Sequence, residues 1–255
     1  MTDSYPPGTP NWIDLGTTDI AGAASFYGRL FEWTHEDFGP DMGNYGMFFK
    51  DGKQVAGVNP TLDADRGAAW VTYFSVPDAD DVAARVEANG GKVIFAPMDV
   101  ADQGRMAVFT DPTGAFFSIW QAGMHTGAEL MNAPGSLTWN ELSTVDIEGA
   151  KAFYSTVLPL GTRSVSMGEG APYTLFEAGG RTVAGALDAS AGGGLSMWTV
   201  YFAVEDCDAM FAAALAFGAT AIAAPEDSPA GRFGFLSDPQ GGAFAILKND
   251  PNFTI

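Results

Sequence analysis

Basic residues, histidines and cysteines are scarce in this 255-residue chain, and each scarcity excludes a class of function. Twelve Lys and Arg side chains stand against 31 Asp and Glu side chains, which gives a net charge of −19 at pH 7. Such a chain repels nucleic-acid phosphates, and no stretch clusters basic with aromatic residues, so we expect no nucleic-acid partner. The excess of acidic residues has two interpretations: a solvated surface of a soluble protein, or a preference for cationic ligands.

Cysteine and long apolar runs are also nearly missing. The lone Cys207 excludes an internal disulfide and is expected to be a buried thiol in a reducing compartment. The longest helix-like apolar run, from Ala209 to Phe217, is much too short to cross a bilayer, so we expect no membrane partner. The N-terminus lacks the basic start and apolar run of a signal peptide. These features predict a cytoplasmic protein.

An internal repeat organises the sequence. The segment from Trp12 to Tyr27 recurs from Trp139 to Tyr154, so that residue 12 corresponds to residue 139, a spacing of 127. In each copy an alternating stretch predicts a strand, and an Asp (Asp19 or Asp146) then stands where the N-cap of a helix should be. Apolar residues at i, i+3, i+4 and i+7 follow, which predicts one buried helical stripe.

Later segments recur in the same order. The strand Trp70–Val76 matches Trp198–Val204, and the Asp-Pro-x-Gly turn at Asp111 matches the one at Asp238. We therefore predict an α+β fold of two tandem domains, each built from two βαβββ modules that form a curved mixed sheet around a cup. The expected organisation is a disordered arm (1–8), a first domain (9–122), a linker (123–134), a second domain (135–248) and a tail (249–255).

The motifs Leu15-x-Thr17-x-Asp19, Phe26-Tyr27 and Asp-Pro-x-Gly resemble the vicinal oxygen chelate superfamily, which contains glyoxalase I, bleomycin-resistance proteins and extradiol dioxygenases. The segment from Gly8 to Asp19 looks especially like its two-domain actinobacterial branch. That branch includes a mycobacterial culture-filtrate antigen and accessory hydroxylase proteins of aromatic polyketide pathways. The resemblance implies the fold strongly and the activity only weakly, because one fold hosts many functions.

Metalloenzymes of this superfamily place His or Glu ligands on cavity-facing strand positions, and a divalent metal needs three or four such donors. Carried over residue by residue, the ligand positions fall on side chains that are not competent ligands: Trp12, Val71, Ser118, Trp139, Thr199 and Ala245. The remaining position falls within 53–59 or 181–187, and neither stretch has a His or Glu. We therefore expect no metal and no other cofactor. His35 and His125 are expected to be surface or structural residues.

Two acids remain as candidates for chemistry. Asp14 and Glu141 are equivalent in the repeat and share the cavity-facing side of their strands with Trp12 and Trp139. They either hold a cationic or hydroxyl-bearing ligand, act as a base, or are structural carboxylates bound by nearby backbone or hydroxyl groups. With these four, the predicted ligand-binding residues are Tyr73, Phe116, Ser118, Trp120, Thr199 and Tyr201.

The sequence leaves three functions open. The favoured one is metal-independent binding of a small aromatic or amphipathic molecule, such as an antibiotic or polyketide-like metabolite, by a sequestration or pathway accessory protein. The alternatives are a glyoxalase-like lyase or accessory hydroxylase, with Asp14 or Glu141 as candidate catalytic residues, and a purely structural interaction protein. A sheet apolar on both sides suits a ligand cup as well as a buried domain interface. The expected state is a monomer with intramolecular domain pairing.

Overall fold

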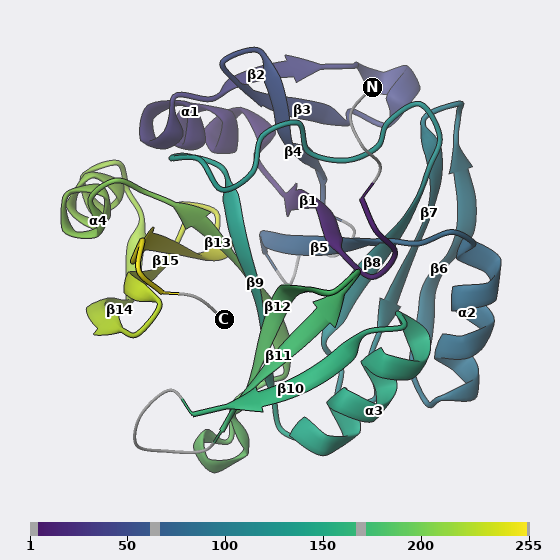
Figure 1. Cartoon of the computed structure of the whole chain (residues 1–255). Coiled ribbons are helices and arrows are strands. Elements are labelled where there is room, and N and C mark those ends of the chain that lie inside the picture. Colours follow the sequence, from purple (N-terminus) through teal and green to yellow (C-terminus); the bar gives the residue numbers. More distant parts are fainter. Residues whose placement is uncertain (1–4, 62–66, 167–171, 254–255) are drawn as a thin grey trace. The chain divides into compact units, whose positions relative to one another are not determined.

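The computed structural model describes residues 5–61, 67–166 and 172–253. Each half of the sequence forms one eight-stranded mixed sheet with two helices, as predicted (Figure 1). The first half contains β1 (Pro10–Thr17), α1 (Ile20–Phe31), β2 (Thr34–Asp37), β3 (Gly46–Lys50), β4 (Lys53–Pro60), β5 (Ala69–Ser75), α2 (Ala79–Ala88), β6 (Lys92–Val100), β7 (Gly104–Thr110) and β8 (Phe116–Ala122). The second contains β9 (Leu137–Thr144), α3 (Ile147–Val157), β10 (Gly161–Val165), β11 (Tyr173–Ala178), β12 (Arg181–Asp188), β13 (Met197–Ala203), α4 (Cys207–Ala216), β14 (Thr220–Ser228), β15 (Gly231–Ser237) and β16 (Ala243–Asn249).

The two sheets have the same strand order. It is β2-β3-β4-β1-β5-β8-β7-β6 in the first and β10-β11-β12-β9-β13-β16-β15-β14 in the second. The pairs β1/β4, β5/β8, β9/β12 and β13/β16 are parallel, and the hairpins around them are antiparallel. Four strands, β2, β6, β10 and β14, pair with only one neighbour each. All four lie at the edges of their sheets.

The local signals that start the repeated helices are confirmed. The Asp19 carboxylate accepts a hydrogen bond from the Gly22 backbone N–H at 2.9 Å, and Asp146 accepts one from Gly149 at the same distance. Each contact satisfies an amide of the first turn that has no partner within the helix. Asp51 and Gly52, both at positive φ, form the hairpin turn between β3 and β4.

The chain divides into two compact units, and each takes residues from both halves of the sequence. Unit 1 consists of Met1–Trp12, Thr72–Gly127 and Trp139–Thr199, and it contains α2 and α3. Unit 2 consists of Ile13–Val71, Ala128–Thr138 and Val200–Ile255, and it contains α1 and α4. The sheets therefore follow the sequence halves, whereas the compact units each combine one βαβββ module from either half. The domain boundaries drawn from the repeat, 9–122 and 135–248, stay a prediction.

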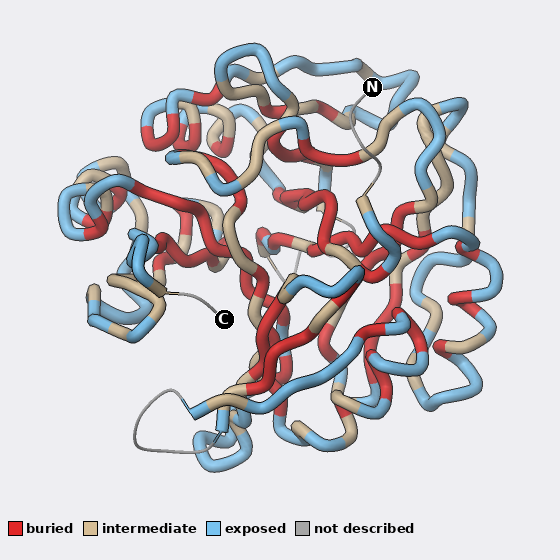
Figure 2. The backbone as a smooth tube through the Cα atoms, in the orientation of Figure 1, coloured by how far each residue is buried: buried red, intermediate tan, exposed pale blue. Residues whose placement is uncertain are grey.

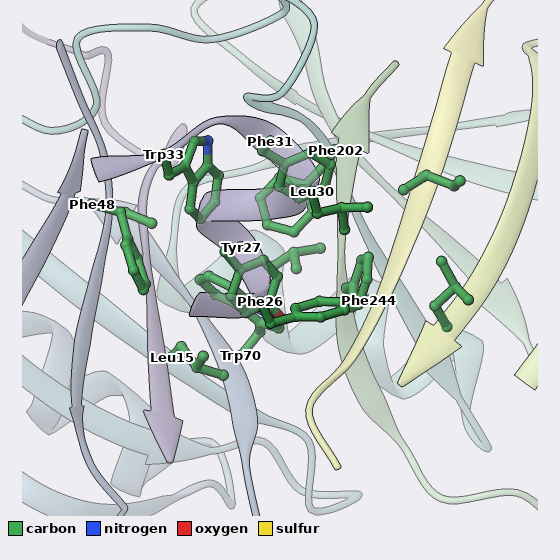
Figure 3. Packing of buried hydrophobic residues seen from close by; sticks show 14 of the residues in the cluster. Leu15, Phe26, Tyr27, Leu30, Phe31, Trp33, Phe48, Trp70, Phe202 and Phe244 are labelled. Atoms are coloured by element: carbon green, nitrogen blue, oxygen red, sulfur yellow. The ribbon is translucent and has the colours of Figure 1, made fainter. Parts of the chain in front are cut away.

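Each unit has its own core of buried hydrophobic residues. Figure 2 marks the buried residues in red along the backbone. In unit 2 the fully buried Tyr27 lies among aromatic rings, with ring centroids 5.5 Å from Trp33 and 5.4 Å from Trp70 (Figure 3). In unit 1 the equivalent Tyr154 lies 5.4 Å from both Phe117 and Trp198. Alternate residues along the central strands are buried in these cores: Phe74, Val76, Phe117 and Ile119 in unit 1, Phe202, Val204, Phe244 and Ile246 in unit 2.

A hydrogen-bonded chain of three side chains crosses each core. In unit 1 the Trp198 indole N–H donates to the Tyr154 hydroxyl at 2.9 Å, and that hydroxyl donates to Asp111 Oδ2 at 3.1 Å. In unit 2 Trp70, Tyr27 and Asp238 make the same chain, with both distances 2.9 Å. The repeated Phe-Tyr, Trp and Asp-Pro-x-Gly motifs thus meet inside the cores, where they satisfy one another's polar groups.

Residues 5–8 of the segment predicted as a disordered arm lie against β5. The Gly8 backbone N–H donates to the Ser75 carbonyl at 2.8 Å, and the Ser75 hydroxyl donates to the Tyr5 carbonyl at 3.0 Å. Residues 1–4 of that segment lie outside the described residues. Within the part of the chain that the structure describes, no helix is long and apolar enough to cross a membrane.

Candidate functional site

The acid predicted on the first strand of unit 2 is bound by a tyrosine. Asp14 on β1 is buried, and its Oδ1 accepts a hydrogen bond from the Tyr45 hydroxyl at 2.9 Å. Gly57 on β4 lies opposite Asp14 in the parallel pairing. A Cβ atom at residue 57 would collide with Asp14 Oδ1 and the Tyr45 hydroxyl. The missing side chain of Gly57 therefore makes room for the pair.

The equivalent acid in unit 1 has the same surroundings. Glu141 on β9 accepts a hydrogen bond from the Tyr173 hydroxyl at 2.6 Å, and the Trp139 indole N–H donates to that hydroxyl at 3.1 Å. Gly185 on β12 pairs with Glu141, and a Cβ atom there would collide with the Tyr173 ring and hydroxyl. Each half of the sequence thus carries an acid, a tyrosine and a glycine in equivalent places.

The electrostatics of this group keep the tyrosine protonated. Burial raises the pKa of Tyr173 well above its ordinary value, and the nearby charge of Glu141 raises it further. The hydroxyl therefore donates and the carboxylate accepts at neutral pH. Trp139 and Glu141 are both half-buried, so this group has access to solvent. The hydrogen bond from the tyrosine uses one of the about four lone-pair positions of the carboxylate.

A second predicted group lies on β5 and β8 of unit 1. Tyr73 and Ser118 are partners in the parallel register, and both are buried. Phe116 is half-buried two residues before Ser118. Trp120, two residues after it, donates its indole N–H to the His125 carbonyl at 2.8 Å. The structure thus brings three predicted aromatic residues and one hydroxyl to a single strand face.

The His125 ring packs against two tryptophan side chains. Its ring lies edge-on against Trp12, with centroids 4.6 Å apart, and against Trp120, with centroids 5.6 Å apart. The segment that carries it, between β8 and β9, was expected only to link the domains. The other histidine, His35, lies on edge strand β2 with its ring 5.6 Å from Phe48.

The remaining predicted residues lie on β13. Thr199 is the last residue of its segment in unit 1, whereas Tyr201 belongs to unit 2, and both are buried. The Tyr201 ring contacts Phe235 at 5.7 Å and Phe233 at 6.5 Å between centroids. Neither phenylalanine is among the site residues predicted from the sequence. Of the ten predicted residues, Asp14 and Tyr201 lie in unit 2 and the other eight in unit 1.

Comparison with known proteins identifies the family. Residues 9–119 match the model of the Glyoxalase/Bleomycin resistance protein/Dioxygenase superfamily, and residues 140–247 match a glyoxalase-like domain. The chain is 43% identical to the putative glyoxylase CFP32 of Mycobacterium tuberculosis, over 97% of both chains. The chain belongs to this superfamily. It is also 39% identical to the anthracycline biosynthesis protein DnrV of Streptomyces peucetius, covering 96% of this chain and 94% of that one.

Solved structures of the superfamily have the same fold. The Mn(II)-bound glyoxalase from Novosphingobium aromaticivorans superimposes with a TM-score of 0.65 at 17% identity, covering 95% of this chain and 82% of that one. An identity this low carries the fold and not the activity.

The superfamily implies a metal, and the residues present do not fit one. The expected ligand positions on the central strands hold tryptophan, valine and alanine, which have no lone pair to offer a cation, or neutral hydroxyls, which are poor substitutes for His or Glu. They are Trp12, Val71, Ser118, Trp139, Thr199 and Ala245. Gly57 and Gly185 lie in the two stretches expected to carry the last ligand. Among the described residues, no three His, Cys, Asp or Glu side chains gather as a possible metal site.

Proposed function

We propose that this protein binds a small aromatic or amphipathic molecule without a metal ion, as a sequestration or pathway accessory protein. One observation carries the proposal. The first strand of each repeat carries an acid two residues beyond the expected metal-ligand position. That acid accepts a hydrogen bond from a tyrosine hydroxyl, and a glycine on the neighbouring strand leaves room for the pair. In unit 1 this group includes the indole of Trp139. An oriented carboxylate beside an aromatic ring suits an organic ligand better than a cation that needs three or four donors.

The chemistry of the group favours a planar ligand with a hydrogen-bond donor. A ring stacked on Trp139 contributes about 0.5–1.5 kcal/mol beyond the burial of its area. An ammonium or hydroxyl group adds a charge-assisted hydrogen bond to Glu141. The net charge of −19 attracts cationic ligands over longer distances. The Streptomyces peucetius relative is by name an anthracycline biosynthesis protein, which supports a polycyclic aromatic ligand.

The proposal also covers the localisation and the oligomeric state of the protein. We propose a cytoplasmic monomer that brings its two halves together within one chain. The internal repeat supplies both equivalent groups, so a second copy of the chain is not needed to complete either of them.

Calorimetric titration tests the ligand. The probes are an anthracycline that carries an amino sugar and the corresponding neutral aglycone. We expect the amine-bearing probe to bind more tightly, and Asp14→Asn or Glu141→Gln to weaken it by roughly tenfold or more, because each removes a charged acceptor. Glu148→Gln, which removes the same charge from an exposed position on α3, is the matched control and should leave affinity unchanged.

Two results would contradict the proposal. If the amine-bearing probe binds no better than the aglycone, and neither acid substitution weakens it, the carboxylates are structural. If chelation abolishes binding and zinc, nickel or iron restores it, the metal-independent part is wrong.

The second candidate is an enzyme, either a glyoxalase-like lyase or an accessory hydroxylase. The 2.6 Å hydrogen bond between Tyr173 and Glu141 favours it, because a carboxylate and a phenol in direct contact can pass a proton to and from a bound substrate. Turnover of a substrate by the wild type that Glu141→Gln abolishes, with binding retained, would support this candidate over a binding protein.

A further inference from the structure

Ser118 carries a buried hydroxyl that makes no hydrogen bond to the described residues. The residue is fully buried on β8, and its Oγ has no hydrogen-bond partner among the described residues. A buried hydroxyl without a partner destabilises the fold, so native proteins usually pair such groups. The neighbouring buried hydroxyls on β5 follow that rule: Thr72 donates to Asn140 Oδ1 at 2.8 Å, and Ser75 donates to the Tyr5 carbonyl. Ser118 therefore differs from the buried hydroxyls of β5, because its own hydroxyl has no hydrogen-bond partner within the described part of the chain.

The position of Ser118 points to a ligand. Its side chain is on the strand face that also holds Phe116 and Trp120, and Tyr73 is its partner in register. These residues all belong to unit 1. The repeat places Ala245 at the equivalent position on β16, so the hydroxyl is special to the first half of the sequence. One polar atom set among aromatic rings is a common pattern of sites that bind aromatic molecules and fix their orientation.

We propose that Ser118 Oγ is the polar anchor for a planar aromatic ligand that bears oxygen, a phenol or a quinone carbonyl, on the β5–β8 face of unit 1. The proposal rests on the proposed function and deepens it, because it names the strand face and the ligand group. A hydroxyl accepts from a phenol and donates to a carbonyl, so it serves both oxygen types.

Because Ser118 is fully buried, the proposal requires that a side chain covering it move when the ligand binds. Val108, its partner on β7, and Phe116, its neighbour along β8, are both half-buried. The neighbouring rings then pack against the ligand while Ser118 holds its oxygen.

Fluorescence titration with naphthol and naphthalene tests the anchor, because the two probes differ by one hydroxyl group. We expect Ser118→Ala to weaken naphthol binding by about threefold to tenfold and to leave naphthalene binding unchanged. The same substitution should leave the melting temperature of the free protein equal to or above that of the wild type, since it removes a buried hydroxyl that has no partner.

Thr174→Val is the matched control. Thr174 on β11 is also buried with an unpartnered hydroxyl, and it lies two residues from Phe176 on the face that packs into the core of unit 1. Its replacement should not lower the melting temperature and should leave the affinity for both probes unchanged.

The possible outcomes distinguish a failure of the Ser118 anchor from a failure of the proposed function. If the wild type binds both probes and Ser118→Ala binds naphthol equally well, the anchor is wrong and the proposed function stands. A lowered melting temperature of Ser118→Ala would also overturn the anchor, because it would show that the protein itself uses the hydroxyl. If the wild type binds neither these probes nor the anthracyclines, the proposed function fails and the anchor fails with it.

Discussion

Replacing Tyr154 by phenylalanine removes one oxygen atom from the core of unit 1 and breaks two hydrogen bonds at once. The hydroxyl accepts from the Trp198 indole at 2.9 Å and donates to Asp111 Oδ2 at 3.1 Å. All three side chains are buried, with relative exposures of 0% for Tyr154, 5% for Trp198 and 3% for Asp111. Water cannot replace the lost oxygen without a rearrangement of the core, so both partners are left unsatisfied.

The magnitude follows from these two partners. A hydrogen bond to a charged acceptor contributes roughly 1.5–3 kcal/mol, and a buried unsatisfied donor costs about 1–3 kcal/mol. The two effects share one hydroxyl and do not simply add, so we expect the free energy of unfolding to fall by about 3 kcal/mol. The loss should stay limited, because Asp111 Oδ1 keeps its contacts with Thr113 and the Ala115 backbone N–H.

Urea unfolding followed by circular dichroism measures the change, provided that the slope with denaturant stays constant. Thr156→Ala is the control, because it removes a hydroxyl from the exposed side of the same helix and should change stability by no more than about 0.5 kcal/mol. Tyr27→Phe, the equivalent change in unit 2, should match Tyr154→Phe. A loss below about 1 kcal/mol for Tyr154→Phe would show that water replaces the missing hydroxyl and that the core does not exclude water at this position.

Three further predictions concern titration, reactivity and local packing. Burial raises the pKa of Tyr154 and of Tyr173 above the unfolded value of about 10, so both tyrosines stabilise the fold fully below that pH and lose this contribution as the pH rises further. The free energy of unfolding, measured from neutral pH to strong alkali, should therefore fall only above about pH 10. A fall that begins near neutral pH would contradict this prediction. Burial also raises the pKa of the Cys207 thiol to about 11, so iodoacetamide at pH 8 should label the native protein much more slowly than the urea-unfolded chain, and equal rates would mean that the thiol is exposed. Gly185→Ala places a methyl group against Tyr173 and should cost about 1–3 kcal/mol, whereas Gly194→Ala, at a position with open space around it and, like Gly185, no positive φ, should cost clearly less; equal losses would show that the Tyr173 contact does not matter.

The sequence predicted the interior of the fold well and its edges poorly. Strands buried on both faces have apolar runs bounded by turn residues, and the limits predicted for one of them, Trp70–Val76, agree with β5 (Ala69–Ser75) to within one residue. The edge strand β6 is largely exposed and contains Pro97, so it has neither an apolar run nor a clean alternation. An edge strand is defined by its pairing with a neighbour, and a single sequence does not show that pairing.

The candidate site was predicted in part for a similar reason. Asp14 and Glu141 were found because they recur within one motif. Their partners Tyr45 and Tyr173 recur at nearly the same spacing, but they lie far from the acids along the chain, so proximity in sequence did not link them. Superposing the two halves of the repeat could have revealed the pairs. The orphan hydroxyl of Ser118 could not have been found in that way, because only the folded chain shows which polar atoms lack a partner.

Because each unit takes residues from both halves of the sequence, cutting the chain between the halves should disrupt both units. Each core takes one βαβββ module from either side of the segment between β8 and β9. A gene cut within that segment would therefore yield two fragments, each with two helices whose apolar faces have lost the module that covers them. Fragments of this kind should aggregate when made separately and recover the native spectrum when made together. The protein would then serve as a split reporter, in which complementation of the fragments restores the binding of an aromatic dye.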